Sequence, residues 1–313
     1  MIYVGIDLGG TNIAVGVVSE KGELLAKKST PTRRDVSAEE VIKDMATTTL
    51  SLLEENGYKV CDVISIGIGS PGSVDKAKGL LVYANNLPFL NTPMRDEMQK
   101  YINKPVYIDN DANCAAWAEA MAGATKDVSD SVAVTLGTGV GGGIVINRRL
   151  YSGFNYTGGE LGHIVINVDG EECTCGRKGC WEAYASATAL IRQTKEAAEK
   201  DKNSKLWDYY KKSGKFTGRT AFDAAREGDE TAKKVVENYT KYVACGLTNI
   251  VNIFQPEIIV IGGGVANEGE ALMKPVCEYV ERETYGNPTN KCEIKKAFLG
   301  NDAGIIGAAL LKD

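Results

Sequence analysis

Hydrophobic and polar positions alternate near the start of the chain and predict a β-hairpin with a glycine turn. Residues 2–7 read IYVGID, the turn reads LGGTN, and IAVGVVS continues as a second strand. A third strand, LLAKKST, follows the turn SEKGE. The same unit recurs about 130 residues later as VAVTL, GTGVGG and GIVINRR. Because this spacing is far longer than a solenoid repeat, the recurrence indicates a duplicated domain, with two matching halves flanking one cleft.

In the rest of the chain the sequence predicts two strands that are each followed by a helix, and two further helical segments. Residues 105–108 predict a strand, and an alanine-rich helix begins at about residue 112. A buried strand, IIVI, ends in three glycines before another helix pattern. Residues 195–235 are rich in charge and predict a solvated helical insertion. Residues 302–312, DAGIIGAALLK, predict a short amphipathic helix that returns to the first domain.

The composition predicts a soluble globular protein of about two domains. The chain has 313 residues, 43% of them apolar, and a formal net charge of -5. No long run of like charge suggests a nucleic-acid tail. The N-terminus lacks the basic region and apolar core of a signal peptide, and no apolar run approaches the roughly eighteen residues of a membrane span. We therefore expect a cytoplasmic protein that binds small molecules, without nucleic-acid or membrane partners.

The chain's one histidine, His163, lies ten positions before a run with three cysteines, Cys173, Cys175 and Cys180. Three thiolates and an imidazole form a recurrent tetrahedral zinc site, and the two glycines in CTCGRKGC permit a tight loop. The alternative is a core histidine with incidental or redox-active cysteines, although the usual CxxC redox spacing is absent. We expect the five other cysteines to lie in the core: Cys61, Cys114, Cys245, Cys277 and Cys292.

The glycine turns of the two hairpins are candidate phosphate-binding sites. A strand follows GIGSPG at 67–72 and GTGVGG at 137–142, whereas a dinucleotide-binding GxGxxG motif requires a helix there. The Walker pattern is absent as well. We therefore expect backbone amides of the hairpin turns to bind phosphate; a turn that uses glycine only for its conformation is the alternative. The expected nucleotide-binding residues here are Gly9, Gly10, Thr11, Asn12, Gly137, Thr138 and Gly139.

Two further features complete the expected nucleotide site. Asp7, at a strand end beside glycines, would repel phosphate unless a divalent cation lay between them, which implies Mg²⁺, and Thr11 offers a hydroxyl donor. We expect Gly263 and Gly264, between a buried strand and a helix, to allow close approach of adenosine. The alternative for these two glycines is an ordinary strand-to-helix loop.

Four polar residues cluster where the strand at 105–108 gives way to a helix. They are Asp109, Asn110, Asp111 and Asn113. Helix capping alone would require only one of them. We expect Asp111 to accept the proton of a hydroxyl and Asn110 to orient that hydroxyl. Phosphoryl transfer requires little more than such a base, positioning and neutralisation of charge.

Carboxylates flank the cysteine run on both sides. Glu160 lies three residues before His163, and Glu182 lies two residues after Cys180. A metal that fixed the loop would hold both carboxylates as rigid acceptors for sugar hydroxyls, and His163 would keep its second ring nitrogen free to donate. The alternative for Glu182 is a favourable interaction with a helix dipole.

Together these residues resemble the ROK family of sugar kinases and their relatives, over residues 3 to about 310. The motifs that carry the resemblance are DLGGTN at 7–12, GIGSPGSV at 67–74, NLPF at 86–89, DNDAN at 109–113, LGTGVGGG at 136–143, GGELGH at 158–163, CTCGRKGCWE at 173–182 and QPEIIVIGGGVA at 255–266. Trp181 stands where the family often has leucine, and NLPF replaces a common NLPGW-like run, which leaves the identity of the sugar open. The family also contains repressors with an N-terminal winged helix, which we do not expect here because the first glycine turn begins at residue 9.

The resemblance implies an α/β, actin-like ATPase (ribonuclease H-like) fold of two similar domains around a central cleft. The expected domains are residues 1–111 with 298–313, and residues 112–297 with the zinc loop and helical insertion. It also implies Asp111 as the base, ATP phosphates on the glycine hairpins, and a homodimer or homotetramer. The implied sugar ligands are Asn86, Asn110, Glu160, His163 and Glu182, and the implied zinc ligands are His163, Cys173, Cys175 and Cys180.

We therefore expect ATP-dependent phosphorylation of glucose at its 6-hydroxyl, with Mg²⁺ and a structural Zn²⁺. Kinases for fructose, N-acetylmannosamine or N-acetylglucosamine are alternatives of the same class. A sugar-sensing protein without catalysis is an alternative of another class, although Asp111 and both phosphate turns are retained. An actin-like filament protein would have no role for the cysteine and carboxylate cluster.

Overall fold

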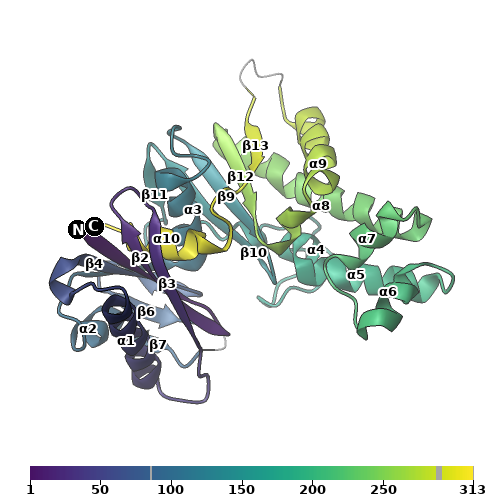
Figure 1. Ribbon diagram of the computed structural model, residues 1–313. Coiled ribbons are helices and arrows are strands. Elements are labelled where there is room, and N and C mark those ends of the chain that lie inside the picture. Colours follow the sequence, from purple (N-terminus) through teal and green to yellow (C-terminus); the bar gives the residue numbers. More distant parts are fainter. Residues whose placement is uncertain (85–86, 287–290, 313) are drawn as a thin grey trace. The chain divides into compact units, whose positions relative to one another are not determined.

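The computed structural model describes residues 1–84, 87–286 and 291–312 and divides them between two compact units (Figure 1). The first unit comprises Met1–Ala133, Gly143–Gly159 and Ala297–Asp313. The second comprises Val134–Gly142 and Glu160–Lys296. These units are groups of residues in mutual contact, and the domain boundaries expected from the sequence stay a prediction.

The first unit contains a five-stranded mixed sheet in the order β3-β2-β1-β4-β8. Its strands are β1 (Ile2–Leu8), β2 (Asn12–Ser19), β3 (Leu24–Pro31), β4 (Val63–Ser70) and β8 (Val106–Asn110). β1 and β2 pair antiparallel, as do β2 and β3, which confirms the predicted first hairpin and third strand. β1, β4 and β8 run parallel, with Asp7 opposite Gly69 and Gly69 opposite Asp109. Their carboxyl ends therefore meet at one edge of the sheet.

Helices cover both faces of this sheet (Figure 1). α1 (Ala38–Glu55) begins with a capping box between Ser37 and Glu40, and it packs with α2 (Met94–Gln99) on one side. α3 (Asp111–Ala122) and α10 (Ala303–Ala309) pack on the other. A Cβ added at Gly67 would lie 1.7 Å from the Ala308 carbonyl oxygen, so α10 approaches the strands closely. The predicted return of the C-terminal helix to the first unit is confirmed.

Three short strands form a separate small sheet in the order β5-β6-β7. They are β5 (Ser73–Asp75), β6 (Leu80–Tyr83) and β7 (Leu90–Thr92). The turn between β5 and β6 contains Lys76, which pairs with Asp109 of β8.

The second five-stranded sheet has the order β11-β10-β9-β12-β13. Its strands are β9 (Ser131–Leu136), β10 (Val140–Ile146), β11 (Arg149–Tyr151), β12 (Ile258–Gly262) and β13 (Glu293–Lys296). The order matches that of the first sheet strand for strand: a hairpin and its third strand, followed by two later strands. The two matching halves predicted from the sequence are thus confirmed at the level of sheet order.

The helices of the second unit are α4 (Glu182–Ala185), α5 (Ala187–Lys200), α6 (Leu206–Ser213), α7 (Thr220–Arg226), α8 (Glu230–Phe254) and α9 (Glu270–Glu283). The charge-rich segment predicted as a helical insertion contains the end of α5, all of α6 and α7, and the start of α8. It has an apolar cluster of its own, which includes Leu206 and Phe216. Trp181 lies fully buried against α8, where a Cβ at Gly246 would come within 2.0 Å of its ring.

The prediction that five cysteines outside the metal run lie in the core was wrong for most of them. Cys114 is buried, Cys61 is exposed at a short 3₁₀ turn, and the other three are half-buried. Apolar neighbours in sequence did not predict burial, because Cys61 lies in a turn and Cys245 and Cys277 lie on helices that are buried along one face only. Within the described residues, every helix is too short or too polar to cross a membrane.

Candidate functional site

Hydrogen bonds to its carbonyl groups fix the first glycine turn. The Gly9 amide donates to the Asn12 carbonyl oxygen at 3.0 Å, which closes the turn. The Thr32 hydroxyl donates to the Gly9 carbonyl at 2.7 Å, and the Arg34 guanidinium donates to the Gly10 carbonyl. Because these carbonyls already have donors, the turn is suited to present amides, rather than carbonyls, to a ligand. Sequence reasoning missed Thr32 and Arg34, which follow β3.

Asp7 lies at the end of β1 in an electrostatically unusual position. Burial, together with the nearby charge of Asp111, raises the pKa of Asp7 to about 6, although Lys27 opposes the shift. α10 approaches its carboxyl group so closely that a Cβ at Gly304 would lie 2.6 Å from Asp7 Oδ2. A bound divalent cation would favour the charged carboxylate, so this position fits the Mg²⁺ expected from the sequence.

The polar residues at the junction of β8 and α3 have different structural roles. Asn110 is the N-cap of α3, because its Oδ1 accepts hydrogen bonds from the amides of Ala112 and Asn113 at 2.9 and 3.3 Å. Asp109 is buried, and its Oδ1 accepts from the Asn113 side chain at 2.8 Å. Asp111 is therefore not required as the cap. Its side chain still accepts one bond, from the Ala112 amide at 2.9 Å.

Asp111 has the properties of a general base. Burial raises the pKa of Asp111, and the backbone hydrogen bond from Ala112 only partly opposes this. A carboxylate with a raised pKa accepts a proton more readily than an ordinary surface aspartate. The rigid N-terminus of α3 fixes where this carboxylate points.

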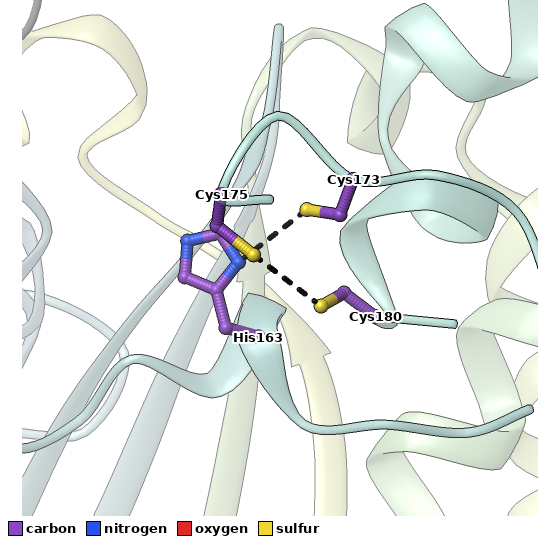
Figure 2. Close-up of side chains that lie close together, drawn as sticks. All are labelled: His163, Cys173, Cys175 and Cys180. Atoms are coloured by element: carbon purple, nitrogen blue, oxygen red, sulfur yellow. Dashed lines mark hydrogen bonds between the residues drawn. The ribbon is translucent and has the colours of Figure 1, made fainter. Parts of the chain in front are cut away.

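The second unit brings His163, Cys173, Cys175 and Cys180 together (Figure 2). Their ligand atoms all lie within 4.8 Å of one another. The sulfurs of Cys175 and Cys180 are 3.7 Å apart, and Cys173 Sγ is 3.7 Å from His163 Nδ1. Zinc–sulfur bonds of about 2.3 Å in a tetrahedron require a sulfur–sulfur separation of about 3.8 Å. The geometry therefore fits a tetrahedral zinc ion.

The chemistry of this cluster also favours a cation. Burial and the neighbouring thiols raise the pKa of Cys180 to about 12. Without a metal, its thiol stays protonated at neutral pH, and a bound zinc ion would stabilise the thiolate. Gly176 and Gly179, at φ values of 86° and 76°, supply the left-handed backbone that turns the loop.

Glu182 connects the cysteine loop to the second glycine turn. Its Oε2 accepts a hydrogen bond from the Val140 amide at 2.9 Å, at the start of β10. Its Oε1 lies 3.8 Å from Cys173 Sγ and 3.5 Å from the Thr174 hydroxyl. Sequence reasoning assigned Glu182 to sugar binding, which stays a prediction, and missed the bond to Val140.

The second glycine turn resembles the first in how its carbonyls are held. The Gly137 carbonyl accepts from the Ala187 amide, and the Thr138 carbonyl accepts from the Thr188 hydroxyl, both at 2.8 Å. The Gly137 amide donates to the Gly139 carbonyl at 3.0 Å. Donors from the start of α5 thus fix the turn, as donors after β3 fix the first one.

The third glycine run lies beside β9, the strand that precedes the second glycine turn. Gly263 has a φ of 85°, and a Cβ there would lie 2.5 Å from the Leu136 carbonyl oxygen of β9. Gly264 faces open space and begins the short helix η3 (Gly264–Glu268). At its end, the buried Glu268 pairs with Arg226 of α7. Gly263 therefore serves close packing, while Gly264 leaves room for a ligand.

Two predicted sugar ligands, Asn86 and Glu160, stay predictions here, and the Glu160 carbonyl accepts a hydrogen bond from the His163 amide at 3.1 Å. Asn86 lies outside the described residues. Glu160 is exposed at the start of the short helix η2 (Leu161–His163). Within the first unit the structure brings Asp7 and Asp111 to one edge of the sheet, and within the second it brings Glu182, the cysteine cluster and the second glycine turn together.

Comparison with known proteins extends over nearly the whole chain. The sequence model of the ROK family matches residues 3–313. A glucokinase from Halalkalibacterium halodurans is 37% identical over 310 residues, covering 99% of this chain and 94% of that protein. The xylose repressor of Bacillus subtilis is 28% identical, covering 97% of this chain and 75% of that protein.

Among solved structures, a ROK family glucokinase from Streptomyces griseus in complex with glucose and AMPPNP matches with a TM-score of 0.84. It is 34% identical, and the match covers 99% of this chain and 98% of that chain. The two sheets of equal strand order and this similarity establish the actin-like ATPase fold.

Proposed function

Because the chain belongs to the ROK family, we propose that it transfers the γ-phosphoryl group of ATP to the 6-hydroxyl of glucose. The observation that carries the proposal is Asp111, a carboxylate with a raised pKa at the carboxyl edge of a parallel β1-β4-β8 sheet. The full-length similarity to a glucokinase and to a structure with glucose and AMPPNP supports the choice of sugar and phosphoryl donor.

In the proposed reaction, Asp111 accepts the proton of the sugar hydroxyl as its oxygen attacks the γ-phosphorus. The turns at Gly9–Asn12 and Gly137–Gly139 bind the phosphates through backbone amides other than those of Gly9 and Gly137, which donate within the turns. Gly264 leaves space for adenosine. Mg²⁺, held near Asp7, would supply neutralisation of the phosphate charge. The proposed sugar ligands are Asn86, Asn110, Glu160, His163 and Glu182.

The cysteine cluster has a supporting part in this proposal. His163, Cys173, Cys175 and Cys180 would hold Zn²⁺ and fix the loop before Glu182. Because Glu182 accepts a hydrogen bond from the Val140 amide, a fixed loop would also fix the second glycine turn. A cytoplasmic location and a homodimer or homotetramer remain predictions.

The Asp111→Asn variant tests the role of the base, because it keeps the size of the side chain and removes proton acceptance. We expect kcat for glucose phosphorylation to fall by about 10²–10⁴, with an unchanged melting temperature. Coupled ADP-release assays measure turnover, and Asp35→Asn, an exposed aspartate of the same unit, is the matched control. Near-wild-type turnover of Asp111→Asn would show that another group accepts the proton.

Two alternatives are separated by the same assay run over a panel of sugars. Preferred turnover of fructose, N-acetylmannosamine or N-acetylglucosamine would assign another hexose. Similarity to the xylose repressor favours, as a second candidate, a sugar-binding protein without catalysis. Sugar binding in calorimetry without sugar-dependent ADP release would support that candidate.

A further inference from the structure

A pocket of about 590 Å³ lies within the first unit and has no part in the proposed reaction. Its volume is in the range of pockets that bind small molecules. Segments far apart in sequence line it: the β5–β6 turn, α2, β8, α3, the β10–β11 turn, and the chain after α10. The charged lining residues are Lys76, Arg95, Asp109, Arg148, Arg149 and Lys312. We call this the basic pocket.

The lining charge is strongly positive, although the whole chain has a net charge of -5. Of the lining residues that the structure describes, five are cationic and one, Asp109, is a carboxylate. Asp109 is already engaged, because it pairs with Lys76 and accepts hydrogen bonds from Asn110 and Asn113. The carboxylate therefore does not neutralise the other four cations.

Among the residues that the structure describes, those four cations have no acidic partner. The Arg95 guanidinium donates to the backbone carbonyls of Lys76, Ala77 and Val106 at 2.8–3.2 Å, which fixes its position and leaves its charge uncompensated. In the described ranges, Arg148, Arg149 and Lys312 form no ion pair with a carboxylate. Positive charge gathered around a concave surface attracts anions and discourages other ligands.

The β10–β11 turn places an arginine where the backbone favours glycine. Asn147 and Arg148 have φ values of 53° and 59°, and the turn pairs Ile146 with Arg149, as in a type I′ hairpin. A side chain other than glycine or asparagine at such an angle is strained, because its Cβ crowds the backbone. Arg148 thus carries a conformational cost at a position that lines the basic pocket. Strain of this kind is concentrated at binding sites.

The pocket chemistry indicates the class of ligand. Arginine guanidinium groups bind phosphate oxygens through paired hydrogen bonds, and two of them are adjacent in this turn. Tyr107, Trp117 and Tyr156 add aromatic walls, and the Trp117 ring is fixed by a hydrogen bond to the Leu310 carbonyl at 2.9 Å. We propose that the basic pocket binds a small phosphate-bearing anion, either free phosphate or a phosphorylated metabolite. This site is additional to the nucleotide site and does not depend on catalysis by Asp111.

Calorimetric titration of the full chain with two probes, inorganic phosphate and glucose 6-phosphate, tests the proposal. Mg²⁺ and AMPPNP are kept at saturation, so that the proposed nucleotide site is occupied. We expect saturable binding of at least one probe, weakened by added sodium chloride. Phosphate bound as tightly as glucose 6-phosphate would identify free phosphate as sufficient, and binding of glucose 6-phosphate alone would identify a phosphorylated metabolite.

The double variant Arg148→Gly/Arg149→Gln tests whether the probes bind in the basic pocket. Glycine suits the left-handed turn, so we expect an unchanged or higher melting temperature and at least about tenfold weaker probe binding. Lys21→Gln/Lys43→Gln, which removes two exposed charges of the same unit outside the pocket, should bind as the wild type does. If the first variant misfolds, Arg149→Gln/Lys312→Gln replaces it.

Two results would overturn the proposal: no saturable binding of either probe to the wild type, or equal binding by the pocket variant and the lysine control. Failure of AMPPNP itself to bind would instead count against the proposed kinase function. The two proposals can therefore fail separately.

Discussion

Two aspartates at the carboxyl edge of the first sheet, Asp7 and Asp111, have raised pKa values, and burial is the main cause in both. Their positions follow from strand register, with Asp7 opposite Gly69 and Gly69 opposite Asp109. The sequence predicted both as functional residues, because Asp7 lies at the end of a strand and Asp111 lies where a strand gives way to a helix. It could not predict the ion pair between Lys76 and the buried Asp109, which depends on where a turn in another part of the chain lies.

The raised pKa of Asp7 predicts how stability depends on pH in the absence of metal. The pKa is about 6 in the folded protein and 3.8 in the reference state, so the folded state binds the proton more tightly. The free energy of unfolding should therefore fall as pH rises from about 4 through about 6, by roughly 3 kcal/mol from this residue.

The Asp7→Asn variant isolates that contribution. We expect it to be more stable than the wild type by up to roughly 3 kcal/mol above pH 6, with the difference vanishing below pH 4. Urea unfolding in a chelating buffer measures this, and Asp35→Asn should show no such difference. Added Mg²⁺ should stabilise the wild type more than Asp7→Asn. A stability difference that is the same at pH 4 and pH 7 would contradict the assignment.

At the scale of elements, local patterns predicted the hairpins, the strand before α3 and the C-terminal helix. Each of these elements has a clear hydrophobic period or is bounded by a recognisable turn sequence. The contacts that join elements were not predictable, and the bond from the Val140 amide to Glu182 is the main example, since 42 positions separate the two residues. This bond gives the cysteine loop a structural connection to the second glycine turn.

Cys175→Ser tests that connection, because Cys175 is the exposed member of the cluster and its replacement should disturb packing least. We expect loss of bound zinc, measured by metal analysis, and a melting temperature lower by several degrees. We also expect KM for ATP to rise about 10-fold or more, because the loop no longer fixes Glu182 against Val140. Cys61→Ser, at an exposed cysteine outside the cluster, should change none of these. An unchanged KM for ATP after verified zinc loss would show that the loop and the turn are independent.

At the scale of the whole molecule, the first unit is completed only by the last residues of the chain. α10 packs on β1, β4 and α3, although the second unit intervenes in sequence. Glycines on the strands make this possible, since Cβ atoms at Gly5 and Gly67 would lie 1.9 and 1.7 Å from carbonyl oxygens of α10. The sequence predicted the helix and its return, but the need for glycine on the facing strands follows only from the packed structure.

Gly67→Ala should therefore separate α10 from the sheet. Because the added methyl group meets backbone, which cannot move as a side chain does, we expect a cost of at least about 1–3 kcal/mol. The loss should appear as a lower urea midpoint and as faster proteolysis near residues 303–309. Gly218→Ala, whose Cβ would meet only Ala187 at 3.9 Å, is the matched control and should be nearly neutral. If Gly67→Ala unfolds at the wild-type midpoint, α10 has room to shift, and the last residues do not complete the first unit in the way the packing indicates.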